Sequence, residues 1–539
     1  MNTISVQWTP FGAGFTEFEI DFANANTDVR IITKCAAQTM DTGQPPMASG
    51  GCEVVLDQKM YSFIANANRG GASLNVTVRG TTDGQCANKS ANSTRMSFAN
   101  EDVLGAIYYW KSTVTANGTG GQIWVKSFGD TVPEALVTTN AASCNGCHAL
   151  SRDGQRMTIY SDDDDSDDEY GDVRGSLIDM TKTPKASIGG IFGPGFSTFS
   201  PDHGLFLSTN GLGSGTTNVL NLEDGNAGGA QTPITVASPG DRPTQPDWSP
   251  DGKTVVFVKP TQVGLWDGNG RKDDDHVFGG SLFTLPYNGN SQFGAAVELL
   301  HSAGENNYYP SYSPDGQFIV FNRAPHDTSV ATIDGCNGTA PQRSCPNDSF
   351  SNPAARVMLL PLTAGAQPVD MQAANGSPAA QPANLSNSWP RWSPFVQNYK
   401  GQRLLWIAFS STRDYGLRVR NHKTGMYQCY PADSFEDPGS AHGQKFQPVC
   451  QQPQLWMAAV NLSGGPHDVI DPSYTAFWLP FQDITTHNHT PQWTQTIAGQ
   501  PPPDAGACIQ NGGDCRANPG GCCSGLACQG DGTCGPIIR

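Results

Sequence analysis

The sequence predicts an all-β protein of 539 residues, with a β-sandwich, a six-bladed β-propeller and a small disulfide-rich knot in chain order. Three observations support this fold class. The chain contains 61 glycines and 39 prolines but only 15% charged residues, which favours short strands and many turns over amphipathic helices. A Ser-x-Asp-Gly turn followed by an apolar strand recurs along the middle of the chain. Six of the 15 cysteines are concentrated near its end.

Residues 1–104 show the period-two pattern of half-buried strands. Apolar and polar residues alternate in "TEFEIDF", "DVRIIT", "CEVVL", "MYSFIA" and "SLNVTVRG". This pattern favours a β-sandwich, with an immunoglobulin- or fibronectin-like module as the expected form.

The middle of the chain is built from repeats. They read "LSRDGQRMTIY" (150–160), "FSPDHGLFLS" (199–208), "WSPDGKTVVFV" (248–258), "YSPDGQFIVF" (312–321) and "WSPFVQNYKGQRLLWIAF" (392–409). Asp-Gly between two strands favours a tight hairpin, because both residues tolerate positive φ. The motif serines are spaced by 49, 49, 64 and 80 residues, as expected for four-stranded blades with loop insertions.

A sixth repeat, "HTPQWTQTI" (489–497), has the strand before the turn but none after it. The segments "AIYYWKS" (106–112), "QIWVKSF" (122–128) and "EALVTT" (134–139) read as three strands without a preceding motif. We expect the C-terminal strand to complete this N-terminal blade, because closure removes an exposed sheet edge. Residues 105–498 would then form six blades.

These "SPDG" repeats resemble the six-bladed propeller of TolB-type proteins over roughly residues 105–498. The resemblance implies a fold. It implies no function, because propellers host binding, scaffolding and catalysis alike.

The end of the chain reads as a Pro-rich linker (499–507) and a cysteine module (508–539). The C…C…CC…C…C order of the module is similar to that of knottins. Six cysteines allow 15 pairings. The resemblance implies the pairs Cys508–Cys523, Cys515–Cys528 and Cys522–Cys534.

Seven cysteines lie outside this module and outside the pair Cys144 and Cys147. Cys336 with Cys345, and Cys429 with Cys450, are predicted to close local loops. Cys35, Cys52 and Cys86 leave one odd thiol, whose partner we expect in sequence that precedes this chain or on another molecule.

The stretch "SCNGCHALSRDGQRM" (143–157) places a Cys-x-x-Cys-His pentapeptide directly before the first repeat. The pentapeptide resembles the haem-attachment motif of c-type cytochromes. The resemblance implies one covalent haem c, with thioethers to Cys144 and Cys147 and His148 as the proximal iron ligand. The alternative is a disulfide or another metal site. No helical cytochrome domain surrounds the motif, so the propeller itself must supply the haem pocket.

Blade alignment indicates the second iron ligand. His489 lies four residues before its motif Trp493, and His148 lies two residues before Leu150 in the next blade around the ring. We therefore favour His489, and then His487, as the distal ligand. Met157 or an open site is the alternative, but a hairpin turn at Asp153-Gly154 places Met157 on the side that His148 already occupies.

Two acidic segments are weak calcium candidates, because Ca²⁺ prefers several carboxylate oxygens. "SDDDDSDDEYGD" contains Asp162 and Asp164, and "DGNGRKDDD" contains Asp267, Asn269 and Asp273. The alternative for the first segment is a solvated, self-repelling loop.

The formal net charge of −17 argues against a nucleic-acid partner, and no apolar run is long enough to span a bilayer. The cysteines and the haem motif indicate export to the periplasm, the outer surface or the medium, although "MNTISVQWTP" has no signal-peptide features.

The leading hypothesis is an exported single-haem cytochrome that transfers electrons with redox partner proteins or by self-assembly, and that is a carrier more than an enzyme. The alternatives are a surface interaction or structural protein with a structural haem, and a haem enzyme such as a peroxidase.

Overall fold

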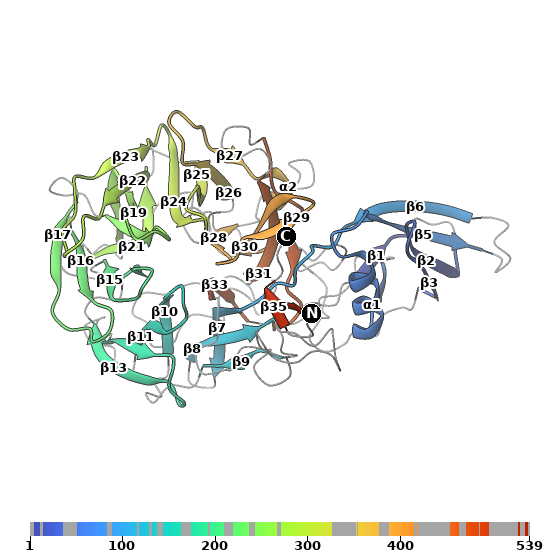
Figure 1. Cartoon of the computed structure of the whole chain (residues 1–539), viewed down its shortest axis with the longest axis horizontal. Helices are drawn as coiled ribbons and strands as arrows, with labels where there is room; N and C mark the ends of the chain where they lie inside the picture. Colours follow the sequence, from blue (N-terminus) through green and yellow to red (C-terminus); the bar gives the residue numbers. More distant parts are fainter. Residues whose placement is uncertain are drawn as a thin grey trace.

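The computed structural model is almost entirely β, as the sequence predicts (Figure 1). The residues that it describes are 5–10, 14–35, 51–82, 89–115, 118–128, 132–136, 144–162, 174–191, 195–209, 219–236, 243–266, 271–325, 352, 354–376, 387–413, 417, 453–462, 470–483, 486–494, 526–528 and 534–536. None of the helices in this part of the chain is long and apolar enough to cross a membrane.

Six antiparallel sheets form a ring among the described residues, and each sheet is one blade (Figure 1). From the axis outward, blade 1 contains β33 (Asn488–Thr494), β7 (Ala106–Thr115), β8 (Gly118–Ser127) and β9 (Glu134–Ala135). Blade 2 contains β10 (Cys144–Leu150), β11 (Arg156–Asp162), β12 (Arg174–Asp179) and β13 (Ala186–Ile191). Blade 3 contains β14 (Ser197–Phe199), β15 (Leu205–Ser208), β16 (Val219–Asp224) and β17 (Thr232–Thr235).

The other three blades follow the same plan. Blade 4 contains β18 (Thr244–Trp248), β19 (Thr254–Lys259), β22 (Ser281–Pro286) and β23 (Val297–Leu300), with the hairpin β20 (Gln262–Trp266) and β21 (Arg271–Phe278) inserted. Blade 5 contains β24 (Glu305–Tyr312), β25 (Phe318–Pro325), β26 (Arg356–Pro361) and β27 (Val369–Asp370), followed by the short helix α2 (Gln372–Asn375). Blade 6 contains β28 (Ser388–Trp392), β30 (Gln402–Ser411), β31 (Gln454–Leu462) and β32 (Phe477–Trp478), and β29 (Gln397–Tyr399) also pairs with β30.

The ring closes through blade 1. The C-terminal strand β33 pairs with β7, so that Trp493 lies opposite Ile107. The innermost strands of consecutive blades contact one another all the way round, from β10 through β14, β18, β24 and β28 to β33 and back to β10. Closure therefore brings the two ends of the propeller segment together at the first and second blades.

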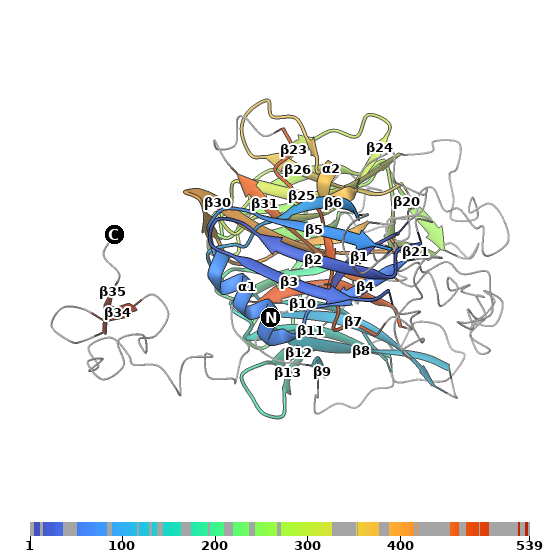
Figure 2. The same ribbon diagram turned by 90° about the vertical axis from the view of Figure 1, so that its right-hand side faces the viewer.

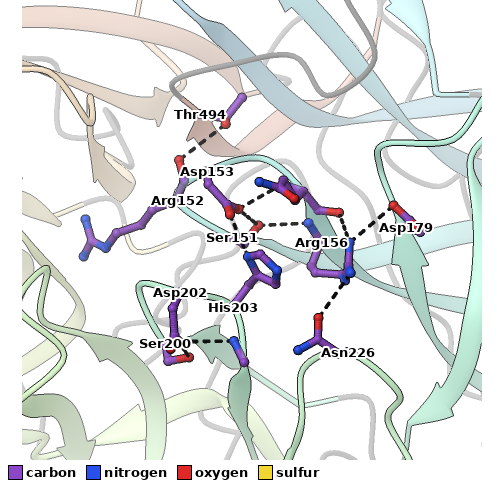
Figure 3. A network of polar contacts seen from close by, with 12 residues as sticks. Ser151, Arg152, Asp153, Arg156, Asp179, Ser200, Asp202, His203, Asn226 and Thr494 are labelled. Carbon is purple, nitrogen blue, oxygen red and sulfur yellow. Dashed lines mark hydrogen bonds and ion pairs between the residues drawn. The ribbon is translucent and has the colours of Figure 1, made fainter.

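The turn after each of the innermost strands β10, β14, β18 and β24 is held by its own serine. The Ser151 hydroxyl donates to the Asp153 carboxylate at 2.6 Å and accepts from the Arg156 amide at 2.9 Å (Figure 3). The corresponding serine–aspartate bonds are 2.6 to 2.7 Å long at Ser200, Ser249 and Ser313. This recurrence explains the Ser-x-Asp repeat, since the serine side chain satisfies the backbone of the turn.

Polar contacts also link neighbouring blades at these turns. The imidazole of His203 in blade 3 shares a 2.6 Å hydrogen bond with Asp153 of blade 2 (Figure 3). The guanidinium of Arg403 in blade 6 lies 2.7 Å from the carboxylate of Asp315 in blade 5. The Thr494 hydroxyl donates to the carbonyl of Arg152 at 3.5 Å, which joins the last strand of the ring to blade 2.

The N-terminal unit has two layers that share one apolar core. One layer is the sheet of β3 (Asp28–Thr33), β2 (Glu17–Ala23), β5 (Leu74–Thr81) and β6 (Lys89–Met96), and the other combines the pair β1 (Ser5–Trp8) and β4 (Cys52–Val55) with the helix α1 (Gln58–Asn68). Figure 1 shows this unit beside the ring.

The predicted strand in "MYSFIA" is wrong, because these residues belong to α1. The Asp57 carboxylate accepts hydrogen bonds from the amides of Lys59 and Met60, both at 2.9 Å, and so caps the N-terminus of the helix. The buried Ile64 also suits one face of a helix, while the side chain of Phe63 is 63% exposed. The helix cap at Asp57 therefore decides the local structure, in spite of the apparent alternation of apolar and polar residues.

One disulfide is present among the described residues, between Cys35 and Cys52. It pairs two of the three N-terminal cysteines and leaves Cys86 as the odd one. Cys86 lies outside the described residues, as do Cys336, Cys345, Cys429 and Cys450.

Near the end of the chain, β34 (Leu526–Cys528) pairs with β35 (Cys534–Pro536), with Cys528 opposite Cys534 in the register. Figure 2 shows this hairpin apart from the ring. The other four cysteines of the module lie outside the described residues, so the knottin pairing remains a prediction.

Candidate haem-attachment site

The Cys-x-x-Cys-His pentapeptide lies on β10, the innermost strand of blade 2. The register between β10 and β11 shifts between Gly146 and His148, which leaves Cys147 out of the ladder. A bulge of this kind bends the strand and changes the direction of a side chain. The motif therefore lies at a bend in the innermost strand of the blade. The side chains of Cys144 and Cys147 lie outside the described part of the structure, and their thioether role remains a prediction.

His148 is deeply buried, with 6% of its surface exposed. Among the described residues no side chain is hydrogen-bonded to its ring nitrogens, and a main-chain group of Tyr108 is the polar neighbour that raises its pKa. Burial dominates and, together with the charge of Arg391, lowers the pKa of His148 to about 4. The imidazole is therefore neutral at pH 7, with a lone pair available to a metal.

The His148 side of β10 faces blade 1. Leu150 lies two residues along the strand and so on the same face, and it packs against Tyr108 of β7 in a shared core. Met157 lies directly opposite Leu150 in the register, as predicted, and is completely buried in this core. Met157 therefore packs between blades on the same side as His148.

His489 lies on β33, which contacts β10. Its ring is 4.6 Å, between centroids, from the ring of Trp110, its partner in the register on β7. Burial lowers the pKa of His489 well below its usual value, and His487 and His148 lower it further. The structure thus places the two histidines that blade alignment selected on two innermost strands that contact each other.

His487 lies just before β33. Its ring contacts Trp110 at 6.5 Å and His489 at 6.2 Å, between centroids. Its amide donates to the hydroxyl of Ser112 at 2.8 Å. His489 lies within β33, the strand that contacts β10, whereas His487 precedes it, so His489 remains the first choice.

Four innermost strands carry the same irregularity. Gln245, Tyr309, Trp389 and Thr490 each precede a proline, adopt φ between 51° and 55°, and lie where the register shifts. Positive φ is uncommon for residues other than glycine and costs of order 1–3 kcal/mol. Because positive φ recurs at equivalent positions of four blades, it indicates a shared structural role in the ring. Counted back from the motif Leu150, Cys147 occupies this position in blade 2.

Side chains at this position meet between blades. The rings of Tyr309 and Trp389 are 4.4 Å apart, and Phe196, which precedes β14, lies 5.2 Å from Trp389, between centroids. These residues come from blades 5, 6 and 3, so the contacts reach across the ring and place the side chains at its axis. We missed this position in the sequence, but "QPDW", "YPSY", "WPRW" and "TPQW" carry a common signal, a proline two residues before an aromatic residue.

The calcium candidates remain predictions. Asp162 lies at the end of β11 and Asp273 on β21, but their side chains are outside the described part, as are Asp164, Asp267 and Asn269 altogether. Within the described side chains, no group of three or more His, Cys, Asp or Glu is placed to hold a metal ion.

Comparisons with known proteins concern the fold alone. No protein-family model matches the chain, and no curated protein matches it. Among solved structures, TolB from Acinetobacter baumannii is 16% identical with a TM-score of 0.35, over 62% of this chain and 73% of TolB. Hydrazine synthase from Kuenenia stuttgartiensis is 13% identical with a TM-score of 0.32, over 63% of this chain and 89% of its own. The periplasmic gluconolactonase of Pseudomonas aeruginosa is 12% identical with a TM-score of 0.33, over 70% of this chain and 100% of its own. Because these TM-scores are low, the propeller is assigned from the sheet topology and not from the comparisons.

Proposed function

We propose that this chain is an exported, single-haem c-type cytochrome in which a β-propeller holds the haem, and that it carries electrons. The observation that supports this most strongly is the setting of His148. This histidine of a Cys-x-x-Cys-His motif is buried, neutral and without a side-chain hydrogen-bond partner among the described residues.

The described residues fit such a group. A buried imidazole usually donates or accepts hydrogen bonds, and a ring nitrogen left unsatisfied costs of order 1–3 kcal/mol. Iron coordination would satisfy one of the two nitrogens of His148. His489, on the neighbouring innermost strand, would supply a second neutral imidazole as a ligand.

When bound, haem c supplies a one-electron redox centre. The chain would determine its surroundings. Burial of His148 would keep water away from this ligand, and a second histidine ligand would leave no open position for ligand exchange. Trp110 is partly exposed and touches His489, so it connects the distal side to the surface of blade 1.

The acidic chain, with a net charge of −17, suits a redox partner with a basic surface. Self-assembly is the alternative route for electrons beyond this one haem. We place the protein in the periplasm, on the outer surface or in the medium, because cytochrome c maturation and disulfides belong to exported proteins.

The first experiment is to express the chain with a secretion signal in a host that matures cytochromes c, and to stain a denaturing gel for haem peroxidase activity. The wild type should stain, and Cys144→Ala/Cys147→Ala should not. Cys336→Ala/Cys345→Ala is the matched control for the loss of two cysteines, and it should keep the stain. Staining of the Cys144→Ala/Cys147→Ala protein would refute covalent attachment.

Visible spectra then distinguish the roles of the haem. A low-spin spectrum with reversible reduction and no binding of CO supports electron transfer. Rapid CO or cyanide binding by the wild type would instead favour a haem enzyme. A haem that cannot be reduced by soluble mediators would favour a structural role.

A further inference from the structure

Buried polar atoms without hydrogen-bond partners gather at one level of the ring. Thr244 and Gln245 are consecutive residues of β18 in blade 4. Ser388 and Trp389 are the equivalent residues of β28 in blade 6, since each pair stands four and three residues before its motif tryptophan. All four side chains are at least nine-tenths buried. Their two hydroxyls, the amide nitrogen of Gln245 and the indole nitrogen of Trp389 have no hydrogen-bond partner among the described residues.

Contacts through the neighbouring blades join these two pairs. The side-chain oxygen of Gln245 accepts a hydrogen bond from the main-chain amide of Tyr309 in blade 5 at 2.6 Å. The ring of Tyr309 lies 4.4 Å from that of Trp389, and the ring of Phe196, directly before β14 of blade 3, lies 5.2 Å from it, between centroids. Blades 3 and 6 are opposite each other in a ring of six, so Phe196 and Trp389 meet at the axis. We call these residues the axial cluster: Phe196, Thr244, Gln245, Tyr309, Ser388 and Trp389.

The hydrogen bond to Tyr309 fixes which end of the Gln245 amide is left for a ligand. Because the oxygen accepts from Tyr309, the NH₂ group is the end without a partner among the described residues, and it can only donate. The indole of Trp389 is also a donor only, whereas the hydroxyls of Thr244 and Ser388 both donate and accept. A ligand that satisfies all four groups therefore needs several oxygen atoms, of which some accept hydrogen bonds and some donate them.

The axial cluster also restricts the charge of its ligand. None of its six residues is charged, and an ion buried beside neutral side chains is costly. Its three aromatic rings offer an apolar surface, and Phe196 is partly exposed, so the cluster adjoins solvent on that side. A neutral molecule with many hydroxyl groups and an apolar C–H face has the complementary chemistry, and a sugar is such a molecule.

We propose that the axial cluster binds a neutral saccharide, whose C–H face packs on the aromatic rings and whose hydroxyl groups bind the four polar side chains. The cluster belongs to blades 3 to 6, whereas the haem motif lies in blade 2 and His489 in blade 1, so sugar binding does not depend on the proposed haem. Recognition of a sugar would be a second function of the propeller.

The test is isothermal titration of the full-length protein with glucose, galactose, N-acetylglucosamine and cellobiose. At least one of these sugars should bind in the micromolar to millimolar range. Trp389→Phe keeps an aromatic ring but removes the N–H donor. Gln245→Glu keeps an oxygen for the Tyr309 amide but removes the NH₂ donor. Each variant should weaken binding by about tenfold, because each leaves an oxygen of the ligand without its donor.

Trp248→Phe is the matched control for Trp389→Phe. The indole nitrogen of Trp248 is likewise buried without a hydrogen-bond partner among the described residues. Its ring, however, packs against Tyr287 and Phe293 within blade 4, at 5.4 and 6.1 Å between centroids. Trp248→Phe should therefore bind the sugar as tightly as the wild type does.

Arg391→Gln tests the charge of the ligand. The guanidinium of Arg391 lies 5.7 Å from the ring centre of Trp389 and donates to the carbonyl of Pro310 at 3.1 Å. A neutral sugar has no charge for it to pair with, so the affinity of this variant should stay near the wild-type value. A loss as large as that of Trp389→Phe would overturn the assignment of a neutral ligand.

A folded wild-type protein that binds none of these sugars would overturn the proposed site, and so would equal losses of affinity in Trp389→Phe and Trp248→Phe. Covalent haem without sugar binding would leave the proposed electron carrier intact. Sugar binding without covalent haem would leave the saccharide site intact and overturn the proposed function instead.

Discussion

His489 and Trp110 lie opposite each other on the paired strands β33 and β7, with ring centroids 4.6 Å apart. One residue comes from the last strand of the propeller and the other from its first, so the contact exists only in the closed ring. Ring closure thus positions His489, the proposed distal ligand, as well as removing a sheet edge. With the proposed ligands, the coordination of the iron would report on whether the ring is closed.

The first prediction concerns the distal ligand. His489→Ala should keep both thioethers but convert a low-spin spectrum to high-spin and admit CO, because it removes the proposed second imidazole ligand. Visible spectra with and without CO measure this.

Two variants serve as controls for that prediction. His487→Ala should change the spectrum much less, and Met157→Leu should barely change it, because Met157 is buried between blades. A low-spin iron that survives His489→Ala but is lost in Met157→Leu would exclude His489 as the distal ligand.

Gly121 on β8 offers a second test of His489 as the distal ligand. A Cβ at Gly121 would lie 2.1 Å from the indole of Trp110, so Gly121→Ala must displace that ring. Because Trp110 packs on His489, we expect a mixed-spin spectrum and partial CO binding in this variant. Gly190→Ala is the control, since a Cβ there would meet only the carbonyl oxygen of Gly175, at 4.0 Å. An unchanged spectrum in Gly121→Ala would show that Trp110 does not position His489.

The serine–aspartate turns predict an acid-dependent contribution to stability. The hydroxyl of Ser249 is the main cause that lowers the pKa of Asp251 below its usual value. An aspartate with a lowered pKa in the folded state stabilises the protein above its unfolded pKa, near 4, and loses that contribution as the pH falls through the folded value. Ser249→Ala should therefore reduce the free energy of unfolding by about 1 kcal/mol at pH 7, and by less at pH 3.

The control for this prediction is Ser393→Ala. Ser393 holds the same turn position in blade 6, but Phe395 stands where the other turns have aspartate, and its amide is 3.3 Å from the serine hydroxyl. The loss of stability in Ser393→Ala should be equal at pH 7 and pH 3, as measured by urea unfolding. An equal pH response in the two variants would rule out the aspartate as the cause.

The C-terminal module should be dispensable for the haem. β34 and β35 pair with each other and, among the described strands, with no other. Deletion of residues 499–539 should leave the haem content and the thermal midpoint near their wild-type values. Loss of haem on this truncation would mean that the module packs against the ring and that its predicted boundary is misplaced.

The sequence predicted those features of the fold that depend on residues close together along the chain. Ser-x-Asp-Gly fixes a turn through bonds within six residues, so the repeats and the all-β class could be read directly. The haem motif is equally local. Its neighbour Leu150 lies opposite Met157 because the Asp153-Gly154 turn sets the register. The helix at 58–68 was missed because apolar residues there fit two periods, and only the cap at Asp57 separates them.

Tertiary structure decided what depends on closure of the ring. The sequence selected His489 through blade equivalence, but its contact with Trp110 appears only in the fold. Nothing along the chain predicts that Arg152 of blade 2 lies 3.6 Å from the carboxylate of Asp247 of blade 4, since the two residues share no motif. They meet because six innermost strands converge on one axis. This contact is a property of the closed ring, and no single segment of the chain contains it.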